Sequence, residues 1–463
     1  MNLGDTIAAV STPRGKGGVA LLRVSGARAI EICERVFVPR NGKKLSQIAS
    51  RTAVYGEILR VNSDGTVQSI DDGLATLFRA PASFTGEDTV EISCHGGMML
   101  TQTVLTALLA AGARAAEAGE FTRRAFVNGK MGLSSAEALG NLLEAQTEEQ
   151  MALAHAGTRG KVEKRSRAIY EDLRDTLASI YVKIDYPDED LAEMGQEEIA
   201  AALARATRDL TALSDSYRTG HAIMEGIPTV ICGSPNVGKS SLYNRIVGRD
   251  AAIVTDLAGT TRDVLCETAA LGHVTLRLFD TAGLHDTEDV VEKIGIDRAR
   301  QTMDDAELIL AVFDGGRAPS DEERALIAEL KNSRATVIAV INKTDVAENC
   351  VASYEGHFAH TVCVSAKNGT GMDALAACVE ALFTSGEIDV REDAVLTNAR
   401  QHGAALAALE ALRAALDELQ AGLPSDVYCT DVERAMEAIC ELDGRAVSED
   451  IVAQIFSHFC VGK

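Results

Sequence analysis

The 463-residue sequence lacks the marks of several protein classes. Its 10 cysteines include no Cys-x-x-Cys pair, which argues against a disulfide scaffold and against a zinc site of paired cysteines. No apolar run approaches the length of about 20 residues that a membrane-spanning helix needs. No secretory signal peptide is recognisable either. We therefore expect a cytoplasmic protein with reduced thiols and no membrane span.

The sequence has fewer basic residues than acidic ones. Lys and Arg number 45 against 68 Asp and Glu, which gives a net charge of −23. Such a chain repels nucleic acid unless a local basic surface binds it. Arg123 and Arg124 form one small basic cluster, and residues 161–167 hold a second, for which a solvated helix face is the better interpretation.

The sequence does contain a glycine-rich stretch with P-loop spacing, Gly-Ser-Pro-Asn-Val-Gly-Lys-Ser-Ser at residues 233–241. It follows an apolar run at residues 228–232. Its glycines allow consecutive backbone N–H groups to turn toward a β-phosphate. Lys239 can reach the β- and γ-phosphate oxygens, and the Ser240 hydroxyl can ligate Mg²⁺. This stretch predicts a nucleotide site at the start of a helix, whose N-terminus favours the anion.

Three further motifs follow in the order of a GTP-binding domain. Asp-Thr-Ala-Gly at 280–283 closes an apolar strand at residues 274–279, where a carboxylate can hold Mg²⁺ through water and the glycine N–H can sense the γ-phosphate. Asn-Lys-Thr-Asp at 342–345 ends another strand, and Ser-Ala-Lys at 365–367 completes the base pocket. The Asp345 carboxylate can accept from guanine N1–H and the 2-amino group, a donor pair that adenine lacks. We therefore predict GTP rather than ATP.

The residues that these motifs predict to bind the nucleotide are Asn236, Val237, Gly238, Lys239, Ser240, Ser241, Asp280, Thr281, Ala282, Gly283, Asn342, Lys343, Asp345, Ser365, Ala366 and Lys367.

The length predicts about three domains of ~150 residues each. Residues 1–118 alternate short β-like stretches with turns and helical segments, which predicts a small α+β domain. Residues 119–220 and 385–463 carry apolar side chains at helical spacing, and they flank the nucleotide domain at 221–384.

The two helical flanks carry apolar stripes, such as Ile169, Leu173, Leu177, Ile180 and Ile184 in the first. Neither flank looks able to bury its stripes alone, and the chain ends of a domain commonly lie close together. The fold class is therefore expected to be an α/β Ras-like P-loop G domain inserted into one all-α helical domain made from both flanks, after the α+β domain.

Two polar, glycine-bearing stretches stand out in the first domain, at residues 12–18 and 83–97. A glycine-rich loop taken alone is about as often a structural turn as a ligand site. His95 has no second His or Cys at metal-ligand spacing beside it, so a structural histidine is the expected role.

At this point the chain resembles one family over essentially its whole length, the MnmE/TrmE tRNA-modification GTPases. The marks outside the G domain are Asp-Thr-Ile at 5–7, Phe-Thr-Gly-Glu-Asp at 84–88, His-Gly-Gly at 95–97, Gly-Glu-Phe-Thr-Arg-Arg-Ala-Phe at 119–126, Ile-Asp-Tyr-Pro at 184–187 and Phe-Cys-Val-Gly-Lys at 459–463. Ala118, Gly132 and His285 depart from a proline, an aspartate and an arginine usual in the family. These departures affect only local loop geometry and an electrostatic contact.

The resemblance implies a GTPase that acts with an FAD-containing partner of the MnmG/GidA family, as a heterotetramer. Together they would add a carboxymethylaminomethyl or aminomethyl group to carbon 5 of the wobble uridine of certain tRNAs. It also implies a homodimer through the N-terminal domain and a 5-formyltetrahydrofolate that supplies the one-carbon unit. The positions that match the family's folate contacts are Arg23, Glu91, Lys130 and Lys463.

The implied folate contacts are chemically reasonable. A pterin presents a guanine-like donor pair to a carboxylate, and the anionic glutamyl tail suits Lys or Arg. Plain surface lysines remain the alternative for Lys130 and Lys463. Cys460 has no visible His partner, and its role stays open.

Leu284 stands where Ras-like enzymes place the glutamine that orients the attacking water. The resemblance implies that Glu292 acts instead, through a bridging water, while K⁺ fills the place of an arginine finger. The K⁺ ligands would be the Asn236 side chain and the backbone carbonyls of Thr255, Leu257 and Thr260. Thr261 would join Ser240 on Mg²⁺. The whole loop expected at the nucleotide is Thr255, Asp256, Leu257, Ala258, Gly259, Thr260 and Thr261.

G-domain dimerisation across the nucleotide can complete such a loop, so that hydrolysis would report a conformational cycle. The competing hypothesis is an Era-like ribosome-assembly switch GTPase without modification activity. That class needs an RNA-binding module, but no Gly-x-x-Gly loop of a KH domain follows the G domain, and the helical tail is acidic. Folate binding by the purified chain would separate the two hypotheses.

Overall fold

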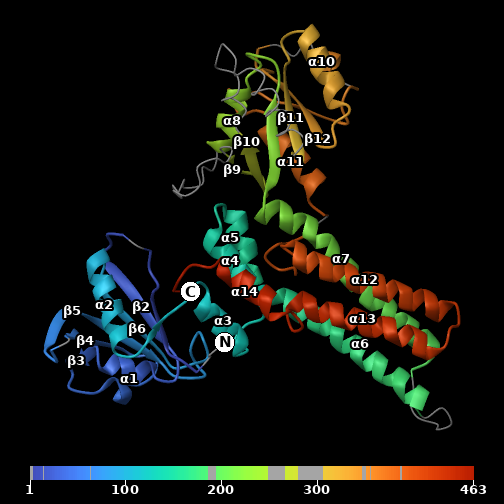
Figure 1. Ribbon diagram of the computed structural model, residues 1–463. Coiled ribbons are helices and arrows are strands. Elements are labelled where there is room, and N and C mark those ends of the chain that lie inside the picture. Colours follow the sequence, from blue (N-terminus) through green and yellow to red (C-terminus); the bar gives the residue numbers. More distant parts are fainter. Residues whose placement is uncertain are drawn as a thin grey trace. The chain divides into compact units, whose positions relative to one another are not determined.

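The structure is a computed structural model that describes residues 4–13, 15–62, 64–185, 194–248, 266–279, 306–346, 351–354, 356–385 and 388–462. The chain divides into two compact units. The first comprises Met1–Gly140 and Asp443–Lys463, and the second comprises Asn141–Leu442 (Figure 1). No described helix is both long and apolar enough to cross a membrane.

The first unit is built on a seven-stranded sheet in the order β3-β4-β5-β6-β2-β1-β7. Its neighbouring strands pair antiparallel, except β1 and β7, which are parallel. The strands are β1 (Ile7–Val10), β2 (Val19–Ser25), β3 (Phe37–Pro39), β4 (Ala53–Val61), β5 (Val67–Phe78), β6 (Thr89–His95) and β7 (Arg114–Ala115). The helices are α1 (Ala29–Glu34), the short 3₁₀ helix η1 (Leu45–Gln47), α2 (Met98–Ala110), α3 (Glu120–Val127), α14 (Glu449–Ser457) and α4 (Leu133–Glu144), whose last four residues belong to the second unit.

The two faces of this sheet have different roles. Leu22 and Val24 are fully buried in a core that also holds apolar side chains of α1 and α2. Because side chains alternate along a strand, Arg23 between them lies on the opposite face. That face receives Phe121 of α3, which packs against Ile7.

The last residues of the chain belong to this first unit. Phe456 of α14 is 1% exposed and packs with Leu133 and Phe126. Beyond α14, the Gly462 carbonyl accepts from the Ser11 hydroxyl at 2.9 Å. The chain therefore returns to the end of β1.

The second unit combines long helices with a second sheet. Its helices outside that sheet are α5 (Glu148–Gly157), α6 (Lys161–Asp185), α7 (Gln196–Met224), α12 (Ala399–Gln420) and α13 (Ser425–Asp443). One apolar core takes side chains from α6, α7, α12 and α13, and Leu173, Leu210 and Leu412 in it are fully buried. Since α7 precedes the second sheet in the chain and α12 follows it, the sheet is inserted between helices that share a core.

The second sheet has the order β13-β12-β11-β8-β10-β9. All neighbouring pairs are parallel except β9 with β10, so the carboxyl ends of five strands meet at one edge. The strands are β8 (Ile227–Cys232), β9 (Cys266–Leu271), β10 (Val274–Phe279), β11 (Leu308–Asp314), β12 (Thr336–Asn342) and β13 (His360–Cys363). The accompanying helices are α8 (Lys239–Val247), α10 (Asp321–Leu330), the 3₁₀ helix η3 (Val351–Ser353) and α11 (Met372–Phe383). The predicted fold class, with a P-loop α/β domain among helices after an α+β domain, is confirmed.

Candidate functional site

The predicted P-loop joins the end of β8 to the start of α8. Its glycines are required by close packing: a Cβ on Gly233 would lie 2.3 Å from the Val312 carbonyl, and one on Gly238 would lie 2.2 Å from the Asn342 amide nitrogen. Both have positive φ, 148° and 101°. Side chains larger than hydrogen would therefore push this loop away from the neighbouring strands.

Lys239 is the first residue of α8, and its ammonium group points back into the loop. Its Nζ donates to the carbonyls of Gly233 and Ser234 at 2.9 and 3.0 Å. Burial lowers the pKa of Lys239. Asn236, Ser240 and Ser241 are exposed at the same loop. An anion in this cradle would meet an ammonium, the helix N-terminus and two hydroxyls.

Asn342, the last residue of β12, ties two loops together. Its side chain is 3% exposed. The amide nitrogen donates to the Val237 carbonyl at 2.9 Å, and the amide oxygen accepts from the Ala366 N–H at 3.0 Å. One neutral side chain thus connects the P-loop to the loop at 365–367.

Lys343 and Asp314 form a second tie that the sequence did not predict. Lys343 Nζ donates to the Asn236 carbonyl at 2.6 Å and to Asp314 Oδ2 at 2.8 Å. Burial by itself raises the pKa of the Asp314 carboxyl, but the hydrogen bond from Lys343 and a backbone N–H outweigh it, so the pKa is lowered. The sequence feature that could have indicated Asp314 was its position directly after the apolar run of β11.

Asp345, the predicted base reader, is exposed and oriented by a neighbour. The Ser365 hydroxyl, in a residue 1% exposed, donates to Asp345 Oδ1 at 2.7 Å. Arg245 of α8 donates through Nε to the Ala366 carbonyl at 2.9 Å and also to the Lys367 carbonyl. Arg245 lies in no motif, so sequence reasoning missed it. The structure therefore brings the P-loop, the 342–345 motif and the 365–367 motif to one edge of the sheet.

Several predicted residues lie outside the described part of the chain, so the structure places none of them. These are Thr255, Asp256, Leu257, Ala258, Gly259, Thr260, Thr261, Asp280, Thr281, Ala282, Gly283, Leu284, His285, Glu292 and Lys463.

The folate-contact positions of the first unit are partly brought together. Arg23 and Glu91 stand directly opposite each other on β2 and β6, and the guanidinium donates to Glu91 Oε1 at 2.9 and 2.7 Å. Their side chains are 17% and 21% exposed. The Arg23 guanidinium lies 5.3 Å from the ring centre of Phe84 and 5.7 Å from that of Phe121. The pair is thus accessible and framed by aromatic rings.

Lys130 contacts the loop that carries Phe84 rather than the charged pair. Its Nζ donates to the Pro81 carbonyl at 2.9 Å. At the chain end, a Cβ on Gly462 would lie 2.4 Å from the Val10 carbonyl, so residue 462 is in contact with the end of β1.

Arg124 is a buried hub rather than part of a basic surface cluster with Arg123. Its side chain is 0% exposed. It donates to Asp5 Oδ1 at 2.6 Å, to Glu120 Oε1 at 3.0 Å and to Glu87 Oε1 at 3.1 Å. The surrounding carboxylates neutralise it, and the sequence interpretation of a basic cluster there is wrong. The hub links the Phe-Thr-Gly-Glu-Asp and Gly-Glu-Phe-Thr-Arg-Arg stretches.

Comparison with known proteins assigns the chain to a family. A family model of the GTP-binding protein TrmE N-terminus matches residues 6–130, and one of the MnmE helical domain matches residues 133–460. The chain belongs to the MnmE family of tRNA modification GTPases. The resemblance predicted from the sequence motifs is confirmed.

Curated MnmE relatives match along the whole chain. The tRNA modification GTPase MnmE of Symbiobacterium thermophilum is 42% identical over 462 residues, which cover 99% of both chains. That of Acetivibrio thermocellus is 38% identical over 462 residues, again 99% of both chains. That of Lactococcus lactis subsp. cremoris is 39% identical over 461 residues, 99% of this chain and 98% of the relative. The MnmE helical match begins before and ends after the second sheet, in agreement with the insertion.

Proposed function

We propose that this chain binds and hydrolyses GTP as part of a tRNA modification. The observation that carries the proposal is the pairing of Asp345 with Ser365 beside the Asn342 tie, because it holds a carboxylate ready for the guanine donor pair. Membership of the MnmE family supports the same activity. A switch GTPase of the Era-like kind would share the nucleotide site but not the match over residues 6–130.

In this proposal Lys239 binds the β- and γ-phosphate oxygens and gives up its two carbonyl contacts in the loop. The exposed Ser240 hydroxyl at the N-terminus of α8 fits a Mg²⁺ ligand, with Thr261 as the second. Bound Mg²⁺ would neutralise charge on the phosphates. The G domains of two copies would meet across the nucleotide, as the family resemblance implies.

We further propose that K⁺ supplies part of the positive charge that an arginine finger gives other GTPases. Asn236 is exposed on the P-loop, with φ of 62°, where its amide oxygen is accessible to an ion. The backbone carbonyls of Thr255, Leu257 and Thr260 would complete the ligands, and Glu292 would position the attacking water. The developing charge between β- and γ-phosphate makes such a cation useful.

GTP turnover at equal ionic strength in KCl and in NaCl tests this part. We expect much faster turnover in KCl, no such difference in Asn236→Ala, and an unchanged difference in the control Asn332→Ala, in the exposed turn after α10. Glu292→Ala should slow hydrolysis without weakening GTP binding. Equal turnover in both salts, with GTP bound in each, would refute the potassium proposal while leaving the GTPase proposal intact.

We also propose that the face of the first sheet with Arg23 and Glu91 binds a one-carbon folate such as 5-formyltetrahydrofolate. What supports it is an accessible carboxylate and guanidinium framed by Phe84 and Phe121, since a pterin offers a flat ring and a donor pair. Lys130 and Lys463 would bind the anionic tail. The proposed homodimer would form through this unit.

Calorimetry with the full chain tests the folate proposal. Saturable binding should be weakened in Glu91→Ala and unchanged in Glu31→Ala, which removes an exposed carboxylate of α1 paired with Arg28. No binding heat in the wild type would remove the one-carbon role.

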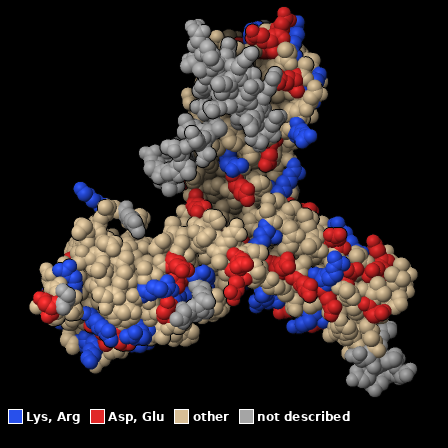
Figure 2. All heavy atoms as spheres, viewed as in Figure 1, with Lys and Arg blue, Asp and Glu red and all other residues tan. Residues whose placement is uncertain are grey.

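The tRNA step is proposed to be addition of an aminomethyl-type group at carbon 5 of the wobble uridine, with an FAD protein of the MnmG/GidA type as partner. Over the visible face of the long helices, Lys and Arg side chains alternate with Asp and Glu (Figure 2). Arg165 of α6, for example, pairs with Asp209 at 2.8 Å. With a net charge of −23, the chain has little general attraction for RNA, which favours tRNA binding shared with a partner.

Mass spectrometry of wobble uridines from a deletion strain tests the whole proposal. The modified nucleoside should disappear, return with the wild-type gene and stay absent with Asp345→Asn. An unchanged nucleoside profile in the deletion strain would overturn it.

A further inference from the structure

His95 ends β6 on the face of the sheet that does not pack against α1 and α2. Its neighbour Cys94 is 3% exposed and lies in the core, so alternation places His95 on the other face, where 70% of its side chain is exposed. Leu74 of β5 pairs with Ser93, and it is 44% exposed on that same face. Asp72 lies two residues before Leu74 on the same strand, so its side chain lies on the same face of the sheet.

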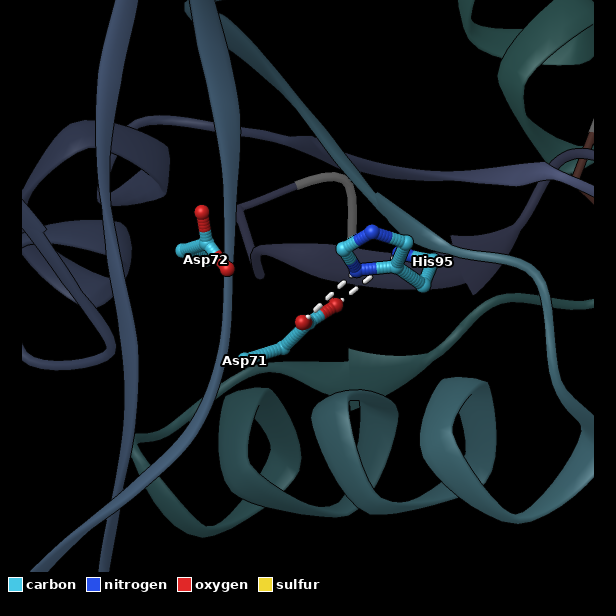
Figure 3. Close-up of side chains that lie close together, drawn as sticks. All are labelled: Asp71, Asp72 and His95. Atoms are coloured by element: carbon cyan, nitrogen blue, oxygen red, sulfur yellow. Dashed lines mark hydrogen bonds and ion pairs between the residues drawn. The ribbon is translucent and has the colours of Figure 1, made fainter.

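The Asp71 carboxylate of β5 meets the His95 imidazole, and the Asp72 carboxylate lies nearby without contacting the ring (Figure 3). Asp71 Oδ1 lies 2.8 Å from His95 Nδ1, and Asp71 Oδ2 accepts from the His95 backbone N–H at 2.9 Å. The ligand atoms of Asp71, Asp72 and His95 all lie within 4.8 Å of one another.

The local strand geometry brings these consecutive acids to one place. The register of β4 against β5 shifts so that Ile70 has no partner, which is a β-bulge directly before Asp71. Gly73 follows Asp72, and a Cβ there would lie 1.9 Å from the Ser93 carbonyl. At this irregular part of β5, Asp71 reaches His95 at the end of β6, while Asp72 accepts from the Tyr55 hydroxyl of β4.

The charge of the cluster is not balanced by a basic side chain. In the described part of the chain, no ion pair joins Asp71 or Asp72 to a Lys or Arg, and Asp72 instead accepts from the Tyr55 hydroxyl. Two neighbouring carboxylates therefore have one imidazole beside them, which Asp71 contacts directly. A metal cation bound to the neutral imidazole would balance their charge.

We propose that Asp71, Asp72 and His95 bind a divalent transition metal of the zinc class. One imidazole nitrogen with two carboxylate oxygens is a mixed set that suits Zn²⁺ better than Mg²⁺, which favours oxygens alone. Ligands at about 2.0–2.2 Å from Zn²⁺ lie closer together than 4.8 Å, so binding requires the exposed His95 ring and the half-buried Asp72 side chain to rotate toward the ion.

The remaining coordination position faces solvent, because His95 is mostly exposed. The site could therefore take a water or an oxygen of a ligand. It is separate from the nucleotide site, since all three residues belong to the first unit.

Zn²⁺ titration of the reduced full chain, without nucleotide or folate, tests the inference independently of the proposed function. We expect His95→Gln and Asp72→Asn each to weaken one Zn²⁺ site at least about tenfold. The matched control His458→Gln, on an exposed histidine of the same unit, should leave it unchanged. Asp71 is left intact because it also holds the His95 backbone.

Cobalt absorption and thermal melting complete the test. Co²⁺ in the wild type should give a visible spectrum without the thiolate charge-transfer band, and this spectrum should be lost in both variants. Zn²⁺ should raise the melting temperature of the wild type and of His458→Gln but not of the two ligand variants. Asp72→Asn is isosteric, so it keeps the test valid if His95→Gln folds poorly.

Zn²⁺ bound equally by wild type and both ligand variants would place the ion elsewhere, for example on the exposed Cys266 or Cys460, and would overturn the inference. So would an absence of Zn²⁺ binding, or a preference for Mg²⁺ over Zn²⁺.

Discussion

The two candidate sites hold their loops by different means. In the first unit a buried guanidinium, Arg124, lies among Asp5, Glu87 and Glu120 and fixes the loop before β6. In the G domain a buried neutral amide, Asn342, joins the P-loop to the 365–367 loop. One site depends on compensated charge and the other on two hydrogen bonds.

This difference has an energetic consequence. Removing one partner from a buried charge network leaves the others uncompensated in a poor solvent for ions. Removing an amide leaves only unsatisfied neutral groups, which costs less. The site around Arg124 in the first unit should therefore fail through loss of folding, and the nucleotide site through loss of binding.

Replacing the hub should have the largest effect. Arg124→Met leaves the carboxylates of Asp5, Glu87 and Glu120 without their common partner, and we expect a loss of ~3–5 kcal/mol in the free energy of unfolding. Denaturant unfolding of the first unit measures it. The control Arg28→Met removes a guanidinium that is 54% exposed and should change stability little. Equal losses in both variants would erase the distinction between the two sites.

Base recognition should come next. Asp345→Asn should lower GTP affinity by ~2–4 kcal/mol and raise affinity for xanthosine triphosphate, because an amide donates where the carboxylate accepted. Nucleotide titration measures both, with Asp321→Asn on the exposed start of α10 as control. Unchanged GTP affinity would contradict the assignment of Asp345.

Removing the two hydrogen bonds of the Asn342 side chain should have a smaller effect. Asn342→Ala leaves the Val237 carbonyl and the Ala366 N–H without their partner, and we expect GTP affinity to fall by ~1–3 kcal/mol with little change in the unfolding of the first unit. Titration and unfolding of the same sample measure the two. If stability fell as far as in Arg124→Met, neutral and charged ties would be equivalent here.

The smallest effect should be a pH-dependent one. Because the native pKa of Asp314 is lowered from 3.8, its tie to Lys343 stabilises the protein above that value and the contribution disappears as pH falls through the native pKa. Asp314→Asn should thus cost ~1 kcal/mol near neutral pH and progressively less in acid. Unfolding across pH measures the difference. A difference that grows toward low pH would have the wrong sign and reject the tie.

Much of the G domain could be predicted because its signals are local. The strand at residues 274–279 was expected from its apolar run and has those bounds in the structure. Asp345 and Lys239 belong to short motifs whose functional residues are adjacent in the sequence. The stripe at residues 169–180 is buried as expected, although Ile184 at its end is 39% exposed.

The first unit could be predicted less well because its contacts join distant residues. Arg124 looked basic in the sequence, yet its partner Asp5 is 119 residues away. His95 looked isolated, because Asp71 precedes it by 24 residues and is brought close only by strand pairing. A β-bulge and a sheet register cannot be read from spacing along the chain.

The insertion also orders events during synthesis. When α7 leaves the ribosome, the chain of α12 that shares its core has not yet been made, since α7 ends at Met224 and α12 begins at Ala399. All strands of the second sheet lie between these helices and can pair as they emerge. Translation therefore lets the nucleotide-binding domain fold before the helical core is complete. Until α12 and α13 are made, part of the apolar surface of α6 and α7 has no partner.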